Sequence, residues 1–149
     1  NAYCKTILCL LASNKTRSFD SGGTVILDNS NLKIASSRNY HHFFPKKYLQ
    51  DKNSGFEPNE PNLIANITLI DGYSNKYRIG KKAPSDYLGK FKKTNKELPE
   101  ILKDHLIDDI KIFGIISNDY PKFISQRSFL IANKLNEKLN PRIVASRKK

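Results

Sequence analysis

Two adjacent histidines stand in a short aromatic run that a proline interrupts. The run reads YHHFF at residues 40–44, and Pro45 follows it directly. Because proline has no backbone N–H to give to a sheet, the run predicts a short strand that ends at this turn. Neighbouring side chains of a regular strand point to opposite faces, so one of the pair, His41 and His42, enters a common site only where the backbone bends. Pro45 marks the place of such a bend.

The next segment alternates apolar and polar residues and then changes to a helical pattern. The alternation covers residues 66–70, with Asn66 and Thr68 on the polar face, and it predicts a half-buried strand. Residues 74–79 fit one or two helical turns, which Gly80 would end. The chain therefore predicts a strand, a loop, a second strand and a short helix, in that order.

The spacing of apolar residues predicts helices on both sides of this segment. We expect one helix over 2–13 and further helices within 85–140, at about 86–92, about 99–106 and from Asp119 to Asn140. Short extended pieces are expected at 24–27 and 32–35.

The length of the chain predicts a single domain. It has 149 residues, and no run of about 18 apolar residues that would span a membrane is present. We therefore expect one α+β domain over residues 1–149, with its core at about 38–82 and flanking helices at 2–13 and 85–140.

The charge of the chain is strongly positive. Its 26 Lys and Arg residues exceed its 14 Asp and Glu residues, which gives a formal net charge of +12. This excess favours a polyanionic partner, most simply nucleic acid. A lysine-rich composition that only keeps the surface soluble is the alternative.

The two cysteines favour a reducing compartment. Cys4 and Cys9 are five positions apart in a predicted helix, so their side chains lie about 140° apart around its axis. A disulfide between them is therefore not expected, and we predict a cytoplasmic location.

The polar residues of the central segment suit hydrolysis of a phosphodiester bond. A histidine with an ordinary pKa of about 6.5 can accept a proton from water at neutral pH. A divalent metal ion can offset the charge of the phosphate and assist the leaving oxygen. Asn66 could hold a backbone carbonyl or an imidazole in place, and Asn75 could offer an oxygen to the metal. By contrast, His105 lies in an apolar helical pattern, so we expect it to be structural.

The segment resembles the HNH, or ββα-metal, nuclease motif. The likeness rests on HHFFPKKYL at 41–49, NLIANITLID at 62–71 and NKYRIGKKAPSDYL at 75–88. Its form is similar to the C-terminal domain of GmrSD-type modification-dependent restriction enzymes. The final stretch DYPKFISQRSFLIANKL at 119–135 also resembles the closing helix of that family.

The resemblance implies a role for each motif residue. It makes His41 and Asn75 the metal ligands, His42 the general base and Asn66 the middle asparagine of the motif. Basic residues in or beside the motif are the expected phosphate contacts, namely Lys46, Lys76, Arg78, Lys81 and Lys82. Mg²⁺ is the metal expected first. Many HNH enzymes have aspartate where this chain has His41, and a neutral imidazole is a softer ligand, so Mn²⁺, Ni²⁺ and Zn²⁺ are alternatives.

The sequence therefore predicts a ββα-metal hairpin embedded among helices and a metal-dependent DNA endonuclease. The family implies a prokaryotic restriction or phage-defence enzyme, and an N-terminal nucleotide-handling domain that precedes this one in a longer protein. Two alternatives remain: a catalytically decayed HNH-like module that only binds DNA, and a structural interaction domain.

Overall fold

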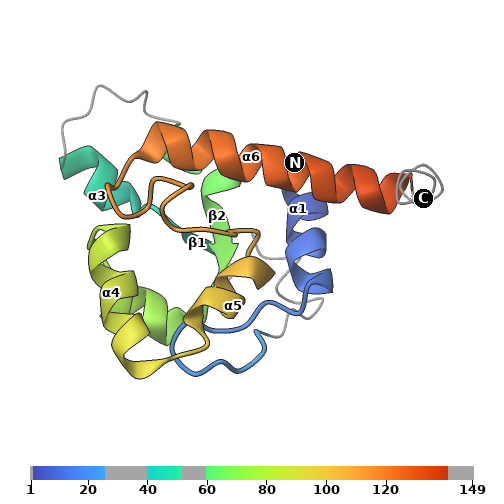
Figure 1. The fold of residues 1–149 in the computed structure, drawn as a ribbon. Helices are drawn as coiled ribbons and strands as arrows, with labels where there is room; N and C mark the ends of the chain where they lie inside the picture. The colour runs from blue at the N-terminus through green and yellow to red at the C-terminus, as the bar shows by residue number, and fades with distance from the viewer. Residues whose placement is uncertain (1, 26–39, 52–59, 141–149) are drawn as a thin grey trace.

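The computed structural model describes residues 2–25, 40–51 and 60–140. It shows helices around a small two-stranded antiparallel sheet, which is compatible with the expected α+β class (Figure 1). The sheet lies between α4 and α1, and the long helix α6 crosses above them in this view. In chain order the elements are α1 (Ala2–Ser13), β1 (Tyr40–His42), α3 (Lys46–Asp51), η1 (Glu60–Asn62), η2 (Ile64–Asn66), β2 (Ile67–Leu69), η3 (Ser74–Ile79), α4 (Pro84–Thr94), α5 (Leu98–Asp104) and α6 (Tyr120–Leu139).

The helices expected from apolar spacing are confirmed, with differences at their ends. Helix α6 begins after Asp119, whose carboxylate accepts a hydrogen bond from the backbone N–H of Lys122 at 3.0 Å. Helix α5 ends earlier than expected because the backbone of Leu106 is left-handed, with φ of 60°. No helix in the described part of the chain has the length and apolar character needed to cross a membrane.

The two strands are shorter than expected, and a helix that was not expected follows the first. Strand β1 ends at His42, and α3 begins directly after Pro45. The fixed φ of proline suits the first turn of a helix, and the Pro45 carbonyl accepts a hydrogen bond from Leu49 N at 3.1 Å. The strand therefore ends before the proline, and Pro45 starts a helix.

The sheet register fixes which strand residues face each other. Tyr40 pairs with Leu69, His41 with Thr68 and His42 with Ile67. In the earlier segment expected to be extended, Thr24 forms an isolated antiparallel bridge with Arg17. Residues 26–27 of that segment and the expected piece at 32–35 lie outside the described residues.

Two apolar clusters hold the fold together. The larger joins the phenylalanines after β1 to α4, α5 and α6, and the smaller joins α1 to β2 and α6. Phe43 and Phe123 lie at the centre of the larger cluster, with stacked rings whose centroids are 4.7 Å apart. Because α6 contributes to both clusters, it joins the two parts of the core.

A fully buried guanidinium connects α6 to the segment before β2. Arg127 is 0% exposed, and its Nη1 donates to the carbonyl of Ala65 at 2.8 Å. Its Nε and Nη2 donate to the carbonyl of His105, at 3.2 and 3.0 Å. Burial lowers the pKa of Arg127 to about 9, so it remains protonated at neutral pH. The cation thus holds two loops against one helix.

His105 lies next to this cation and is structural, in agreement with its apolar pattern. It is fully buried, and its Nε2–H donates to the carbonyl of Arg17 at 2.8 Å. Its Nδ1 is therefore the acceptor for the hydroxyl of Thr68 on β2. Burial lowers the pKa of His105 to about 3, and the charges of Arg127 and Arg17 act in the same direction.

Replacing Arg127 with methionine should lower the free energy of unfolding by about 2–5 kcal/mol. The reason is that the carbonyls of Ala65 and His105 would remain buried without their donors. Arg127→Lys should recover little, since one ammonium group does not reproduce the planar fork. Urea unfolding followed by circular dichroism measures the change. Lys134→Met on the same helix is the control, with an expected change within about 0.5 kcal/mol. An equally small loss for Arg127→Met would contradict the anchoring role.

The stability of the protein should fall on acidification through His105. The unfolded histidine binds a proton below about pH 6.5, whereas the folded one stays neutral down to about pH 3. This group alone should therefore remove about 2 kcal/mol of unfolding free energy between pH 7 and pH 5. The measurement compares wild type with His105→Gln at both pH values. The variant should be less stable at pH 7 but should lose about 2 kcal/mol less on acidification. Equal losses would show that His105 does not carry this effect.

Candidate functional site

The side chain of Asn66 fixes the bend that follows β1. It is fully buried, and its Oδ1 accepts the backbone N–H of Phe44 at 2.8 Å. Its Nδ2 donates to the carbonyls of Phe44 at 3.0 Å and Pro61 at 2.9 Å. The amide therefore uses both its donor and its acceptor character to hold two segments of backbone. The expected role of Asn66 as a residue that holds a backbone carbonyl agrees with these contacts.

The position of Asn66 differs from the expected one in a single respect. The alternating pattern predicted that Asn66 lies within the second strand, but it is the last residue of η2 and β2 begins at Ile67. Its backbone N–H bonds to the carbonyl of Leu63 at 2.8 Å and so closes a tight turn. Its carbonyl still accepts from Phe43 N at 2.8 Å, which continues the contact between the two segments beyond the strands.

His41 lies inside the protein, on the same side of the sheet as its partner Thr68. It is 5% exposed, and burial together with the charge of the adjacent His42 lowers its pKa to about 3. Its Nε2 is buried and has no hydrogen-bond partner within the part of the chain that the structure describes. A buried polar nitrogen without a partner is unfavourable, and it is a feature that calls for an explanation. The neutral imidazole has the electronic form of a metal ligand.

His42 is half-buried and points to the opposite face of β1. Its Nε2 lies 3.2 Å from Oδ1 of Asn62. An amide oxygen only accepts hydrogen bonds, so Nε2 carries the proton and Nδ1 keeps the free lone pair. Burial lowers the pKa of His42, the bond to Asn62 opposes this, and the charge of Lys46 lowers the pKa further. His42 is therefore neutral at pH 7, with one ring nitrogen able to accept a proton.

Asn75 lies on η3, the short helix after the second strand. This helix spans residues 74–79 as expected, in π geometry, and Gly80 ends it with φ of 58°. The carbonyl of Asn75 accepts Gly80 N at 2.8 Å, which leaves the half-buried side chain as the group that could bind a ligand. The start of η3 is held by Asp71, which accepts Ser74 N and the hydroxyl of Ser18, both at 2.8 Å.

The five basic residues expected to contact phosphate differ in their surroundings. Lys46, Lys76 and Lys81 are exposed. Arg78 forms an ion pair of 2.6 Å with Asp20 and lies over the ring of Phe91 at 5.7 Å. Lys82 donates to the carbonyl of Arg78 at 2.6 Å. Contact with phosphate is therefore easiest for the three exposed lysines, because the other two cations already have partners within the protein.

The described residues contain no metal centre formed by histidine, cysteine and carboxylate side chains alone. Within residues 2–25, 40–51 and 60–140, no three side chains of His, Cys, Asp or Glu are grouped so as to hold an ion. A site formed by one imidazole and one amide oxygen, as expected for His41 and Asn75, is of a different kind. It would leave most coordination positions to water and phosphate, as Mg²⁺ sites often do.

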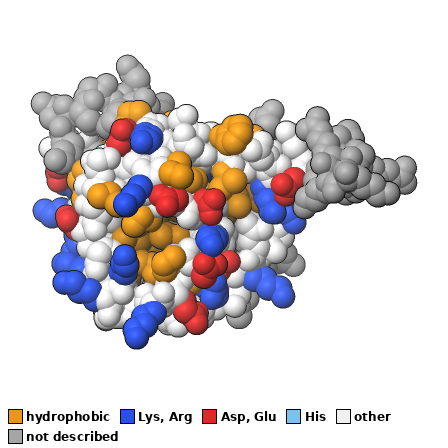
Figure 2. All heavy atoms as spheres, viewed as in Figure 1, with side chains coloured by type: hydrophobic (Ala, Val, Ile, Leu, Met, Phe, Trp, Pro, Cys, Tyr) orange, Lys and Arg blue, Asp and Glu red, His pale blue; other side chains and the backbone are white. Residues whose placement is uncertain are grey.

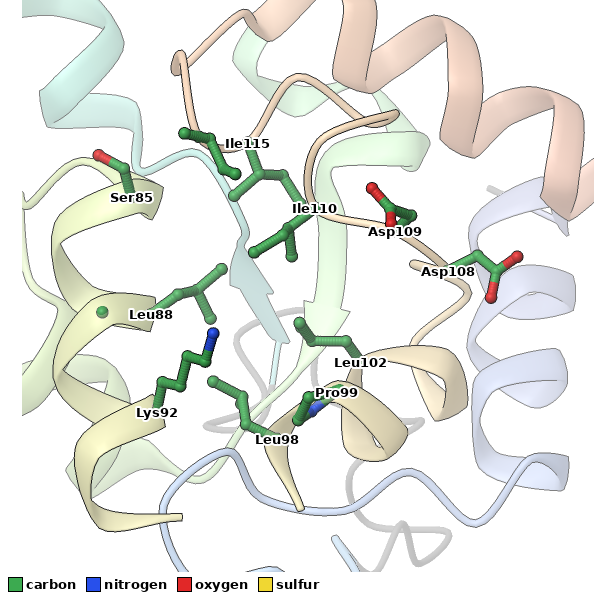
Figure 3. A pocket seen from close by; sticks show the side chains of 12 residues that line it. Ser85, Leu88, Lys92, Leu98, Pro99, Leu102, Asp108, Asp109, Ile110 and Ile115 are labelled. Atoms are coloured by element: carbon green, nitrogen blue, oxygen red, sulfur yellow. The ribbon is translucent and has the colours of Figure 1, made fainter. Parts of the chain in front are cut away.

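A large hollow lies elsewhere on the molecule, between α4, α5 and the loop before α6. Its volume is about 270 Å³, and Figure 3 shows Leu88, Leu98, Leu102, Ile110 and Ile115 around it. Figure 2 shows the corresponding apolar area in the middle of this face. No histidine or asparagine lines it. Asp109 on its rim accepts the backbone N–H of Lys111 and Ile112 and so shapes a turn. The hollow is therefore separate from the residues suited to phosphodiester chemistry.

One residue of the site was not expected from the sequence. Asn62 sets the tautomer of His42, and it is the last residue of η1, directly after Pro61, whose carbonyl the side chain of Asn66 binds. The only sequence signal was its place four residues before Asn66 in the run NLIAN. That signal is weak because asparagine is common in turns for purely local reasons.

Asn66→Asp should loosen the bend after β1 and lower the free energy of unfolding by about 2–4 kcal/mol. An ionised carboxylate has no hydrogen to donate, so the carbonyls of Phe44 and Pro61 would face an uncompensated buried charge. Amide hydrogen exchange at Phe43 and Phe44 should become faster in the variant. Asn133→Asp, at an exposed position of α6, is the matched control and should leave both measurements nearly unchanged. Unchanged exchange in the Asn66 variant would show that the side chain does not hold the bend.

Comparison with protein-family models, with curated proteins and with solved structures finds no match to this chain. Its function is therefore inferred from its own residues. The residues on which it rests are Asn66, which holds the bend, the two histidines, which face opposite sides of β1, and Asn75 on the short helix η3.

Proposed function

We propose that the chain is a metal-dependent DNA endonuclease domain of the HNH, or ββα-metal, type, from a prokaryotic restriction or phage-defence enzyme. The observation that carries the proposal is the bend held by Asn66. Its amide binds the N–H and the carbonyl of Phe44, two residues after the histidine pair. A hydrolytic site needs its base fixed within a fraction of an ångström, and this contact restrains the backbone next to His42.

The order of elements supports the same assignment. Strand β1 pairs with β2, and η3 follows after a short turn held by Asp71. This is the strand, strand and helix order that the motif requires. The histidines lie on the first strand and Asn75 lies on the helix, as expected for a general base and two metal ligands. Because His41 and His42 face opposite sides of β1, their joint action on one phosphate also requires the backbone at the end of this strand to turn.

His42 has the properties of a general base. Its lone pair is at Nδ1, and Asn62 keeps the proton on Nε2 and orients the ring. Burial lowers the pKa of His42, so the ring is unprotonated at neutral pH and ready to take a proton from water. Asn66 acts indirectly, by holding the backbone that carries this ring.

His41 and Asn75 are the residues proposed to hold a divalent metal ion. The buried, unpartnered Nε2 of His41 fits a ligand atom, because binding would satisfy a nitrogen that otherwise lacks a partner among the described residues. With an amide oxygen as the second ligand, Mg²⁺ is the first choice, and Mn²⁺, Ni²⁺ and Zn²⁺ are the alternatives. Such an ion would supply charge stabilisation to the phosphate and its leaving oxygen.

DNA as the substrate follows from charge rather than from base-reading groups. The net charge is +12, and Lys46, Lys76 and Lys81 are exposed. Lysine contacts with phosphate position a protein on a nucleic acid without reading its sequence. A decayed HNH-like module would bind DNA without cutting it, and a structural interaction domain would do neither, so a cleavage assay together with a DNA-binding assay separates the three functions.

His42→Ala should reduce the single-turnover rate of metal-dependent plasmid cleavage by about 10²–10⁴-fold, while DNA affinity stays nearly unchanged. Nicking and linearisation are followed on gels with Mg²⁺, Mn²⁺, Ni²⁺ or Zn²⁺ and with EDTA as the blank. Lys134→Ala, at a partly exposed position of α6, is the control for general effects of substitution. Cleavage near the wild-type rate in the His42 variant would exclude His42 as the base. Failure of the wild type to cleave with any of the four metals would exclude the endonuclease.

His41→Ala should behave differently because it removes a ligand and leaves the base in place. Raising the metal concentration should recover part of its activity, and the same increase should give no recovery in the His42 variant. The half-saturating metal concentration is the quantity to compare. If that concentration is the same in the His41 variant and in wild type, His41 is not a ligand.

A further inference from the structure

Two exposed tyrosine rings lie side by side at the helix that carries Asn75: Tyr73 directly precedes it and Tyr77 belongs to it. Tyr73 is 64% exposed and Tyr77 is 60% exposed, which is high for side chains of this size. Their ring centroids are 5.1 Å apart, and the planes are tilted by 44°. They belong neither to the larger nor to the smaller apolar cluster of the core. The pair is therefore an exposed aromatic surface rather than part of the packing.

Positive charge borders these rings. The ammonium group of Lys76 lies 5.1 Å from the centroid of Tyr77, and Lys81, just after the helix, is exposed. Aromatic rings beside lysines are the combination that binds unpaired nucleic acid, because bases stack on the rings while the cations contact the backbone. An apolar protein partner would not explain why charges border the pair.

The geometry of the pair determines how a base could bind. Carbon atoms in contact are about 3.5–4.0 Å apart, so a base inserted between two rings would need their centroids about 7 Å apart. The observed 5.1 Å leaves no such gap. A base would therefore stack on the outer face of a ring, and the second ring would support the first.

We propose that Tyr73 and Tyr77 form a stacking surface for an unpaired base of DNA, with Lys76 and Lys81 as contacts for the adjacent phosphates. Within a duplex each base face is covered by its neighbours, so the surface selects single-stranded, terminal or displaced bases. The choice of DNA rests on the proposed endonuclease function. On that function, the pair would hold an unpaired base next to the helix that carries the metal ligand Asn75.

Equilibrium binding with defined oligonucleotides tests the proposal. The probes are a fluorescein-labelled 20-nucleotide DNA single strand, its duplex, an RNA strand of the same sequence, and a DNA strand of the same length made mostly of abasic sites. Fluorescence anisotropy is measured in EDTA at fixed salt, so that cleavage does not interfere. The proteins are wild type, Tyr73→Ser with Tyr77→Ser, and Tyr73→Phe with Tyr77→Phe. Phe129→Ser removes a 67% exposed aromatic side chain from α6 and is the matched control.

The serine pair should weaken binding of the single strand by about 5- to 100-fold, the range expected for loss of one stacked base. The phenylalanine pair should stay within about 3-fold of wild type because it keeps both rings. Binding of the duplex and of the abasic strand should change by less than about 3-fold in every variant. Circular dichroism should show that the serine pair is folded, since both side chains are largely exposed.

Other results would overturn the proposal. It fails if the serine pair binds the single strand as wild type does, or if the abasic strand shows the same loss. It also fails if Phe129→Ser has an equal effect, or if only an RNA strand of the same sequence depends on the tyrosines. Metal-dependent plasmid cleavage without any dependence of single-strand binding on the tyrosines would overturn this inference and leave the endonuclease function standing. Tyrosine-dependent binding of the single strand without plasmid cleavage would overturn the endonuclease function and leave the stacking surface standing.

Discussion

The hydrogen bonds of the buried Arg127 guanidinium are the contacts on which the rest of the structure depends. A cation taken out of water loses several kcal/mol of solvation, which only well-placed partners offset. Here the partners are backbone carbonyls, those of Ala65 and His105. Because carbonyls are fixed in the chain, the cation orders backbone directly. It holds α6, the turn before β2 and the end of α5 in one arrangement.

The geometry of the candidate site depends on that arrangement. Ala65 is the residue before Asn66, so the segment that Arg127 binds is the one whose next side chain clamps Phe44. The clamp in turn restrains the end of β1, where His41 and His42 lie. Thr68 lies on β2 opposite His41, and its hydroxyl donates a hydrogen bond to the neutral ring of His105. Polar contacts that are fully satisfied in this way give a unique geometry, which a purely apolar core does not guarantee.

We propose different tasks for the candidate site and for the aromatic surface of Tyr73 and Tyr77. The histidines are sheltered, and burial keeps both of them neutral. The tyrosines and the lysines beside them are exposed on or next to the helix that carries Asn75. Chemistry on a phosphate requires groups whose charge is controlled by burial, whereas capture of a strand requires groups that solvent and substrate can reach. Both properties occur within one short stretch of chain, at residues 41–81.

Local sequence determined the helices, the short helix that ends at Gly80, the opposite faces of His41 and His42, and the structural place of His105. These features follow from periodicity and from the backbone freedom of glycine, which neighbouring residues alone decide. Sequence did not predict that Asn66 precedes the strand, that Pro45 starts a helix, or that Asn62 and Arg78 have side-chain partners within the chain. The helix after Pro45 is a local effect of proline that was not foreseen. The other features depend on groups that meet only after folding: Asn66 on Phe44, Asn62 on His42 and Arg78 on Asp20. The motif could therefore name the candidate residues, whereas their burial and protonation were decided by tertiary packing.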